Sequence, residues 1–321
     1  MLSYTLVLIL SFIVLLFCGH LFVSGAVGIA ERNHIPKIIV GTLLVSMGTT
    51  LPELAVSVQS AIMGYSNLAL GNAIGSVIAD DALAFGLAAL LAPVPFIVNR
   101  KLIKPSAFVL LGSGCLLYIF SLNGTISRLE GIILLGILAA YFGWFISYAK
   151  TQREIVIAEN LDQHIPKIHT RSNLSLILLF SVGLVGVLAS SRGVIWAATG
   201  ISRLLGISEI IIGLTVVAIG TSLPEVTTCI IAALKNEGDI AAGDIIGADI
   251  LNILWIVGMS ATARPLTAEA RTLHFYGGAL LVVVGIFLSI LLFSKKIRKI
   301  HGLILFSLYI LFLSLSYVLF R

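Results

Sequence analysis

The chain has 321 residues, of which 59% are apolar and only 11% are charged, and its mean hydropathy is +1.11. A soluble domain carries about a quarter of its residues as Asp, Glu, Lys or Arg, so this composition excludes a soluble globular enzyme. The net charge of +5 does not indicate nucleic-acid binding, because the basic residues are scattered over short loops.

Apolar runs of the length that crosses a bilayer as a helix, roughly 20 residues, recur along the chain. They predict an all-α polytopic membrane protein with ten transmembrane helices. The predicted spans are 4–28, 36–62, 66–92, 105–122, 128–148, 174–200, 206–234, 240–263, 272–293 and 300–320.

The longest polar stretch, residues 149–173, separates five predicted spans from the other five. We interpret it as a cytoplasmic connector between two five-helix repeats, 1–148 and 174–321. An odd number of spans in each half means that the second half enters the membrane from the opposite side. The sequence therefore predicts an inverted-topology repeat.

Most of the 20 Lys and Arg residues fall on loops that follow odd-numbered spans. Cytoplasmic loops carry an excess of these residues. We therefore expect a protein of the cell membrane with both termini outside the cell.

Two short motifs occur in both halves with the same spacing. GTTLPE at 48–53 returns as GTSLPE at 220–225, which is 172 positions later, and GNAIGS at 71–76 returns as GDIIGA at 243–248. The most similar segments are 35–93 and 207–265. Duplicated polar motifs within apolar spans indicate a transporter whose site lies between the repeats.

Each GTxLPE-like motif contains a proline followed by a glutamate, Glu53 or Glu225. Proline removes a backbone donor from a helix, and the carbonyl oxygens that it frees need a partner inside a membrane. Carboxylates in spans are costly and usually belong to ion pathways. The hydroxyls of Thr49, Thr50 and Ser222 are three or four residues from a glutamate, so they share a helix face with it.

The second motif leads to further oxygen-bearing side chains. Ser76 and Asp80 share a face of the third span, and Asn252 stands at the equivalent of Asp80. Carboxylates, hydroxyls and carbonyls without thiolate or imidazole suit hard cations such as Ca²⁺, Mg²⁺ or Mn²⁺. Two glutamates balance either one divalent or two monovalent ions, which is the electrostatic basis for exchange.

Three further acids, Asp81, Asp244 and Asp249, lie next to these positions. The sequence leaves their role open between direct coordination, support of the ligands, proton transfer and a charged vestibule.

With these motifs in hand, the chain resembles the cation/calcium exchanger superfamily, and more closely its sodium/calcium exchanger branch. The resemblance implies that Glu53 and Glu225 bind Ca²⁺ together with carbonyl groups near Thr49 and Thr221. It also implies an alternating-access motion in which spans one and six slide past the rest. The Na⁺ ligands that it implies are Thr50, Ser76 and Ser222, carbonyls near Ser46 and Ala218, and Asp80 and Asn252 at the middle position.

The chain departs from the family pattern at several of these positions. Ala248 stands where the family often has Ser, Val77 replaces a common Asn, and Asp244 and Asp249 stand where Asn is usual. These changes bear on the number and identity of the coupling ions.

The predicted function is antiport of Ca²⁺ against Na⁺ by alternating access. The alternative is a divalent cation/proton antiporter, and a cation channel or a non-transporting membrane scaffold is a less favoured interpretation. We expect no enzymatic activity and no cofactor, because no nucleophile, phosphate loop or metal–imidazole motif is present. The expected partners are the transported Ca²⁺ and Na⁺, or H⁺ in the alternative, and the lipid bilayer.

Overall fold

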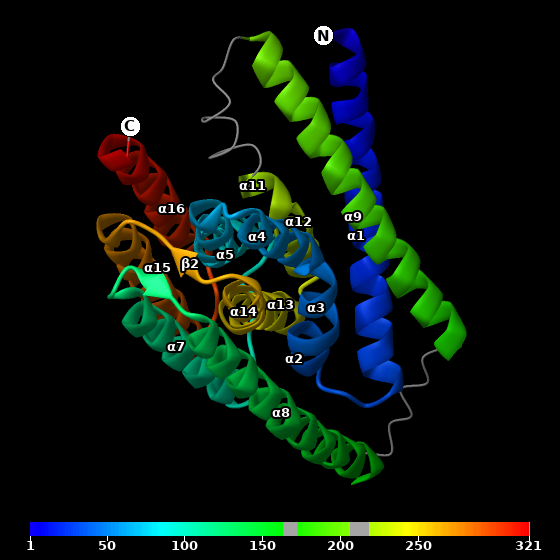
Figure 1. The fold of residues 1–321 in the computed structure, drawn as a ribbon. Helices are drawn as coiled ribbons and strands as arrows, with labels where there is room; N and C mark the ends of the chain where they lie inside the picture. Colours follow the sequence, from blue (N-terminus) through cyan, green and yellow to red (C-terminus); the bar gives the residue numbers. More distant parts are fainter. Residues whose placement is uncertain (163–171, 206–217, 321) are drawn as a thin grey trace.

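The computed structural model describes residues 1–162, 172–205 and 218–320, and these are almost entirely helical (Figure 1). The elements before residue 163 are α1 (Leu2–Arg32), α2 (Lys37–Val40), η1 (Gly41–Val45), α3 (Ser46–Thr49), α4 (Leu51–Met63), α5 (Ser66–Ile78), η2 (Ala79–Ala84), α6 (Phe85–Leu91), α7 (Arg100–Ser121), β1 (Thr125–Ile126) and α8 (Arg128–Asp162). Those after residue 171 are α9 (Asn173–Leu204), α11 (Ala218–Thr221), α12 (Leu223–Leu234), α13 (Gly238–Leu251), η4 (Asn252–Val257), α14 (Gly258–Ala263), β2 (Leu266–Thr267), α15 (Ala270–Phe293) and α16 (Lys299–Phe320). The segments η1, η2 and η4 are π-helical.

The predicted all-α membrane class is confirmed. Eight helices in the described residues are long and apolar enough to span a membrane, and the bent pair Lys37–Thr49 and Leu51–Met63 makes a ninth. The predicted seventh span, 206–234, lies partly outside the described residues, so the count of ten stays a prediction. The predicted connector begins as helix, because α8 continues to Asp162, and its residues 163–171 also lie outside the described part.

Short contacts between loops reproduce the repeat at two places. Strands β1 and β2 pair antiparallel, with Thr125 opposite Thr267, and a single bridge joins Phe96 to Ile297. The offset of 172 positions maps Thr125 onto Ile297, and it maps Thr267 onto Pro95, the residue next to Phe96. The loops that meet follow the predicted fourth and eighth spans in one case and the third and ninth in the other. Each contact thus joins loops that the alternating topology places on one side of the membrane.

The middle of the molecule is the broken helix α13–η4–α14, which is buried over nearly its whole length (Figure 1). Apolar residues dominate this helix, as expected for one surrounded by protein, but it also buries Asp244, Asp249 and Asn252. Gly243 and Gly247 allow it to meet α2, η1 and α3 closely. A Cβ atom at Gly243 would overlap the carbonyl oxygen of Ile38, and one at Gly247 would lie 2.5 Å from the Ser46 hydroxyl. The four-residue spacing of the motif glycines predicts close helix packing in both halves. The prediction is confirmed at Gly243 and Gly247 but is wrong at Gly71 and Gly75, where an added Cβ atom would meet nothing within 4 Å.

The long helices α1 and α9 run side by side along one edge of the molecule (Figure 1). Gly25 of α1 contacts the backbone of Phe180, and Gly183 of α9 contacts the backbone of Phe22. Small residues at such crossings let two backbones approach. The pair contacts each other far more extensively than either helix contacts the remaining elements.

Candidate ion-binding site

The helix that carries Glu53 is interrupted just before the glutamate. Helix α3 ends at Thr49 and α4 begins at Leu51, and the segment Lys37–Thr49 is bent by 47° relative to α4. The same interruption occurs at Ser222, between α11 and α12. The predicted distortion is confirmed, but its form differs from a kink inside a helix. Each proline stands in the first turn of a new helix, where its missing N–H costs little.

This geometry favours negative charge at both glutamates. Glu53 lies in the first turn of α4 and Glu225 in the first turn of α12. The N-terminus of a helix carries partial positive charge from its free N–H groups, which stabilises a nearby carboxylate by about 0.3–1 kcal/mol. Because of the break, each glutamate lies at the positive N-terminal end of a helix dipole, and this end faces the site.

Hydroxyl groups connect each glutamate to the opposite half of the chain. Ser222 Oγ lies 3.5 Å from Glu53 Oε1, and Thr50 Oγ1 lies 3.5 Å from Glu225 Oε1. We expected these hydroxyls to share a helix face with the glutamate of their own motif. The helix break turns them across the interface instead, so that the two repeats interlock.

The middle position pairs Asp80 with Asn252, whose Nδ2 donates to Asp80 Oδ2 at 3.4 Å. Both residues stand in π-helical turns, η2 and η4. Such turns occur frequently at functional sites because they redirect side chains and carbonyls. The hydroxyl of Ser222 also contacts Ser76 Oγ, at 3.3 Å. The four residues of this cluster thus come from both halves.

The remaining candidate ligands surround this centre. Thr49 Oγ1 contacts Asp244 Oδ1 at 3.3 Å, and the carbonyl oxygen of Ser46 accepts from Thr50 Oγ1 at 2.7 Å. The carboxyl groups of Asp81 and Asp249 adjoin each other. Ala218 lies in α11.

One member of the cluster, Asn72, was not predicted from the sequence. Thr221 Oγ1 donates to Asn72 Oδ1 at 3.3 Å, which mirrors the contact between Thr49 and Asp244. The available signal was the offset of 172 positions, because Asn72 is the counterpart of Asp244.

The polar groups of this region are withdrawn from solvent. Glu53, Glu225 and Asp80 are each 1% exposed, and Asp81, Asp244 and Asp249 are fully buried. Several oxygen atoms have no hydrogen-bond partner among the described residues: Glu53 Oε2, Asp80 Oδ1, Glu225 Oε2, Asp244 Oδ2, Asn252 Oδ1 and both carboxylate oxygens of Asp81 and Asp249. A buried carboxylate without a partner is expensive, and a cation would satisfy several of these atoms at once.

No three Asp, Glu, His or Cys side chains within the described ranges converge as a ready-made metal centre. A cation held here would therefore take part of its coordination from hydroxyl and carbonyl oxygens. Such mixed oxygen sets are used for hard cations.

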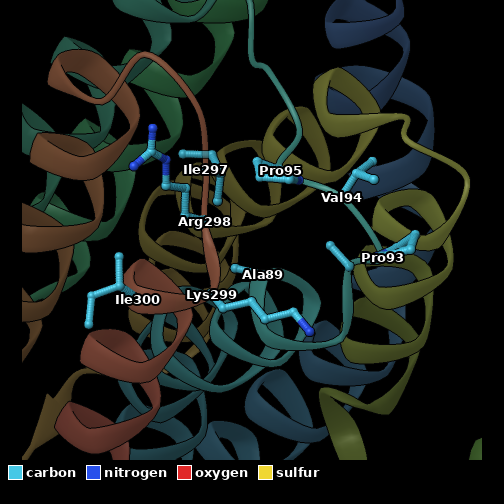
Figure 2. Close-up of a pocket in the computed structure, with 9 residues that line it drawn as sticks. Ala89, Pro93, Val94, Pro95, Ile297, Arg298, Lys299 and Ile300 are labelled. Atoms are coloured by element: carbon cyan, nitrogen blue, oxygen red, sulfur yellow. The ribbon is translucent and has the colours of Figure 1, made fainter.

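A pocket of about 410 Å³ lies elsewhere, where the loop after α6 meets the loop before α16 (Figure 2). Its lining is apolar except for the cations Arg298 and Lys299. Because it offers no carboxylate and carries positive charge, it is separate from the acidic cluster.

The fold and the buried acids define a class of protein: a polytopic membrane protein of inverted repeats whose acidic side chains meet at the repeat interface. The family described as "Sodium/calcium exchanger protein" matches the chain twice, over residues 3–147 and 175–318. The chain therefore belongs to the sodium/calcium exchanger family, and each of its halves matches separately.

Individual relatives agree with this assignment over the whole chain. It is 32% identical to "Putative antiporter CaxA" of Alkalimonas amylolytica, covering 97% of each sequence, and 27% identical to "Sodium/calcium exchanger MaX1" of Methanosarcina acetivorans, covering 96% of this chain and 97% of that one. A solved structure of the sodium-calcium exchanger NCX_Mj superposes with a TM-score of 0.83, at 27% identity, covering 97% of this chain and 98% of the other.

Proposed function

We propose that the protein is an antiporter that moves Ca²⁺ across the membrane in exchange for Na⁺. The observation that carries this proposal is the reciprocal contact between the halves, in which Ser222 meets Glu53 and Thr50 meets Glu225. Two buried carboxylates linked across an inverted repeat form one negative site that both halves share. The match to the exchanger family supports the same conclusion.

In this proposal Glu53 and Glu225 ligate Ca²⁺ together with carbonyl oxygens near Thr49 and Thr221. Na⁺ is ligated by hydroxyl and carbonyl oxygens around them. These Na⁺ ligands are Thr50, Ser76, Ser222 and the carbonyls near Ser46 and Ala218, with Asp80 and Asn252 at the middle position. The two glutamates neutralise either one Ca²⁺ or two Na⁺. Binding of Ca²⁺ therefore excludes binding of the two Na⁺, and the reverse. This competition is what couples the two fluxes.

Access to the site alternates through movement of α1 and α9. Their closest approaches use glycine against backbone, at Gly25 and Phe180 and at Gly183 and Phe22. Such contacts hold the two helices together as one unit. Because the pair touches the rest of the molecule less extensively, it can slide while the buried site stays in place.

We place the protein in the cell membrane with both termini outside. Contacts between distant loops support the alternating topology on which this placement depends. Lys37 forms a salt bridge with Glu237 at 2.8 Å, and Arg153 Nε donates to the carbonyl oxygen of Asn33 at 2.8 Å. Both contacts join segments for which the charge pattern predicts a cytoplasmic location.

Exchange of a divalent cation for protons is a second candidate, and one observation favours it. Asp81, Asp244 and Asp249 add three buried carboxyl groups to those that the exchange of Ca²⁺ for Na⁺ requires. Carboxyl groups next to a cation site are able to carry protons.

Purified protein in liposomes distinguishes these functions. The uptake of radioactive Ca²⁺ is measured with an outward Na⁺ gradient and, separately, with a pH gradient at equal Na⁺. We expect uptake under the Na⁺ gradient and little uptake under the pH gradient alone. Uptake driven only by the pH gradient would identify a proton exchanger, and conductance independent of a counter-ion would identify a channel.

A further inference from the structure

The cluster around Asn72 in the first half is fully hydrogen-bonded. Asn72 Nδ2 donates to Ser57 Oγ at 2.9 Å and to the main-chain oxygen of Glu53 at 3.3 Å. Its Oδ1 accepts from Thr221 Oγ1 at 3.3 Å. Every polar atom of the amide therefore has a partner, and the cluster needs nothing further.

The equivalent cluster in the second half has the same geometry but different chemistry. The offset of 172 positions replaces Asn72 by Asp244, Ser57 by Cys229 and Thr221 by Thr49. The threonine contact is kept, with Thr49 Oγ1 at 3.3 Å from Asp244 Oδ1. The amide that donated two hydrogen bonds has become a carboxylate, which only accepts when it is ionised.

This exchange leaves Asp244 Oδ2 in need of a positive partner. The atom is buried and has no hydrogen-bond partner among the described residues. By the repeat it corresponds to Asn72 Nδ2, which lies next to the glutamate carbonyl and the side chain at position 57. By the same offset, the main-chain oxygen of Glu225 and the side chain of Cys229 are the counterparts of those groups. The main-chain oxygen of Glu225 only accepts hydrogen bonds, and the Cys229 thiol is a weak donor, so neither group supplies a strong donor to Asp244.

Within the part of the chain that the structure describes, no basic side chain forms a salt bridge with this carboxylate. The salt bridges found in the described residues both involve Lys37, with Glu31 and Glu237. A buried ionised group that lacks a counter-charge is strongly destabilising. A small cation at the place of the amide nitrogen would restore the contacts that the first half makes with hydrogen bonds.

We propose that Asp244 binds a monovalent cation of the Na⁺ class, beside Glu225, at the place that the Asn72 amide nitrogen occupies in the other half. The ligands are Asp244 Oδ2 and the main-chain carbonyl of Glu225, with the Cys229 thiol at the edge of the site. A monovalent ion fits because Asp244 alone supplies the charge, whereas Ca²⁺ sites usually gather 6–8 oxygen ligands. The two flanks of the central site then bind Na⁺ unequally. This inference rests on the proposed exchange function and specifies one of its ion sites.

The chain itself supplies the test variant. D244N combined with C229S copies the hydrogen-bonded cluster of the first half into the second half, so a folded product is expected. The reciprocal variant, N72D with S57C, copies the second-half cluster into the first half. The exposed Cys115 provides a control, C115S, that alters a thiol away from the site.

Equilibrium binding of radioactive Na⁺ and Ca²⁺ to the purified full-length variants is measured at several pH values. We expect D244N/C229S to bind about one Na⁺ fewer than the natural protein, because one buried charge is removed, and to keep its Ca²⁺ binding. The reciprocal variant should gain Na⁺ binding, and C115S should show no change.

Unchanged Na⁺ stoichiometry in folded D244N/C229S would overturn the inference. So would unchanged Na⁺ binding with an altered pH dependence, because Asp244 would then hold a proton. If D244N/C229S fails to fold, the reciprocal variant decides, and an unchanged Na⁺ stoichiometry there also overturns the inference. Because binding is measured without transport, the two proposals can fail separately. If the natural protein shows no Na⁺-driven Ca²⁺ uptake, the proposed function is refuted. If D244N/C229S nevertheless binds one Na⁺ fewer than the natural protein, the site at Asp244 is still supported.

Discussion

The two halves of the molecule repeat their contacts more faithfully than their side chains. The contact of Thr50 with Glu225 is copied by that of Ser222 with Glu53, and both measure 3.5 Å. By contrast, Ser76 is replaced by Ala248 at the equivalent position. The backbone framework therefore persists where the ligand chemistry has diverged. Differences between the halves are the place to look for the ion preferences of this particular chain.

The divergence changes which positions of the repeat carry an acid. At the offset of 172 positions, Val77 corresponds to Asp249, Asn72 to Asp244, and Asp81 to Ile253. Each change adds an acid to a buried region. Each half thus buries three acids, but at different positions of the repeat: Glu53, Asp80 and Asp81 in the first half, and Glu225, Asp244 and Asp249 in the second. Substitutions at these positions test what the difference does.

The largest effect is expected at the mirrored glutamates. E53Q and E225Q each remove one of the two charges that balance Ca²⁺, so each should lower Na⁺-driven Ca²⁺ uptake in liposomes by ~100-fold or more, since breaking a buried ionic site costs about 3–5 kcal/mol. Because the contacts are reciprocal, the two losses should be similar.

The exposed loop residue Glu269 offers a matched control, E269Q, which should transport normally. Full activity in either glutamate variant, while the protein inserts and folds, would contradict the shared site.

A smaller effect is expected at the middle pair. Asp80 and Asn252 occupy equivalent positions and contact each other, so exchanging them by D80N with N252D keeps one acid and one amide at the centre. D80N alone should weaken Na⁺ affinity by about tenfold, about 1.4 kcal/mol, and the double exchange should restore most of the loss. A double-mutant cycle of Na⁺ affinities measures this coupling. Strictly additive losses would mean that the two positions are not equivalent.

The smallest effect is expected where a hydroxyl is missing. A248S supplies the group that Ser76 provides in the first half, where it contacts Ser222 at 3.3 Å. One added hydrogen-bonding ligand is worth about 0.5–1.5 kcal/mol, so the Na⁺ concentration for half-maximal exchange should fall by about threefold. S76A is the converse variant and should raise it. If A248S leaves this concentration unchanged, Ala248 does not face a Na⁺ ligand position.

Much of the fold and of the candidate site could be predicted because polar residues that recur in both halves mark the site, whereas polar residues of one half alone do not. Glu53 and Glu225 were identified by their equal spacing from the second motif, and the structure buries both in contact with the opposite half. The hydroxyl partners were predicted less well. Sequence spacing relates Thr50 to Glu53 on one helix, whereas the break at Thr50 turns its hydroxyl toward Glu225.

Other features depend on contacts that a sequence pattern does not encode. The π-helical turns at Asp80 and Asn252 arise where η2 and η4 pack against several surrounding helices. The same holds for the two-residue strands β1 and β2, which are too short to show alternation and pair segments about 140 residues apart, a separation that local rules do not span.

The reciprocal contacts have a consequence for the origin of the molecule. A product of half the gene would contain a glutamate but not the hydroxyl that meets it, so it would enclose a cation only by inserting in both orientations and joining an inverted copy of itself. Gene fusion removes the need for such dual insertion. Once the two copies are covalently joined, each half can change its residues independently of the other. Asp244 and Cys229, which replace the Asn and Ser of the first half, are two such changes.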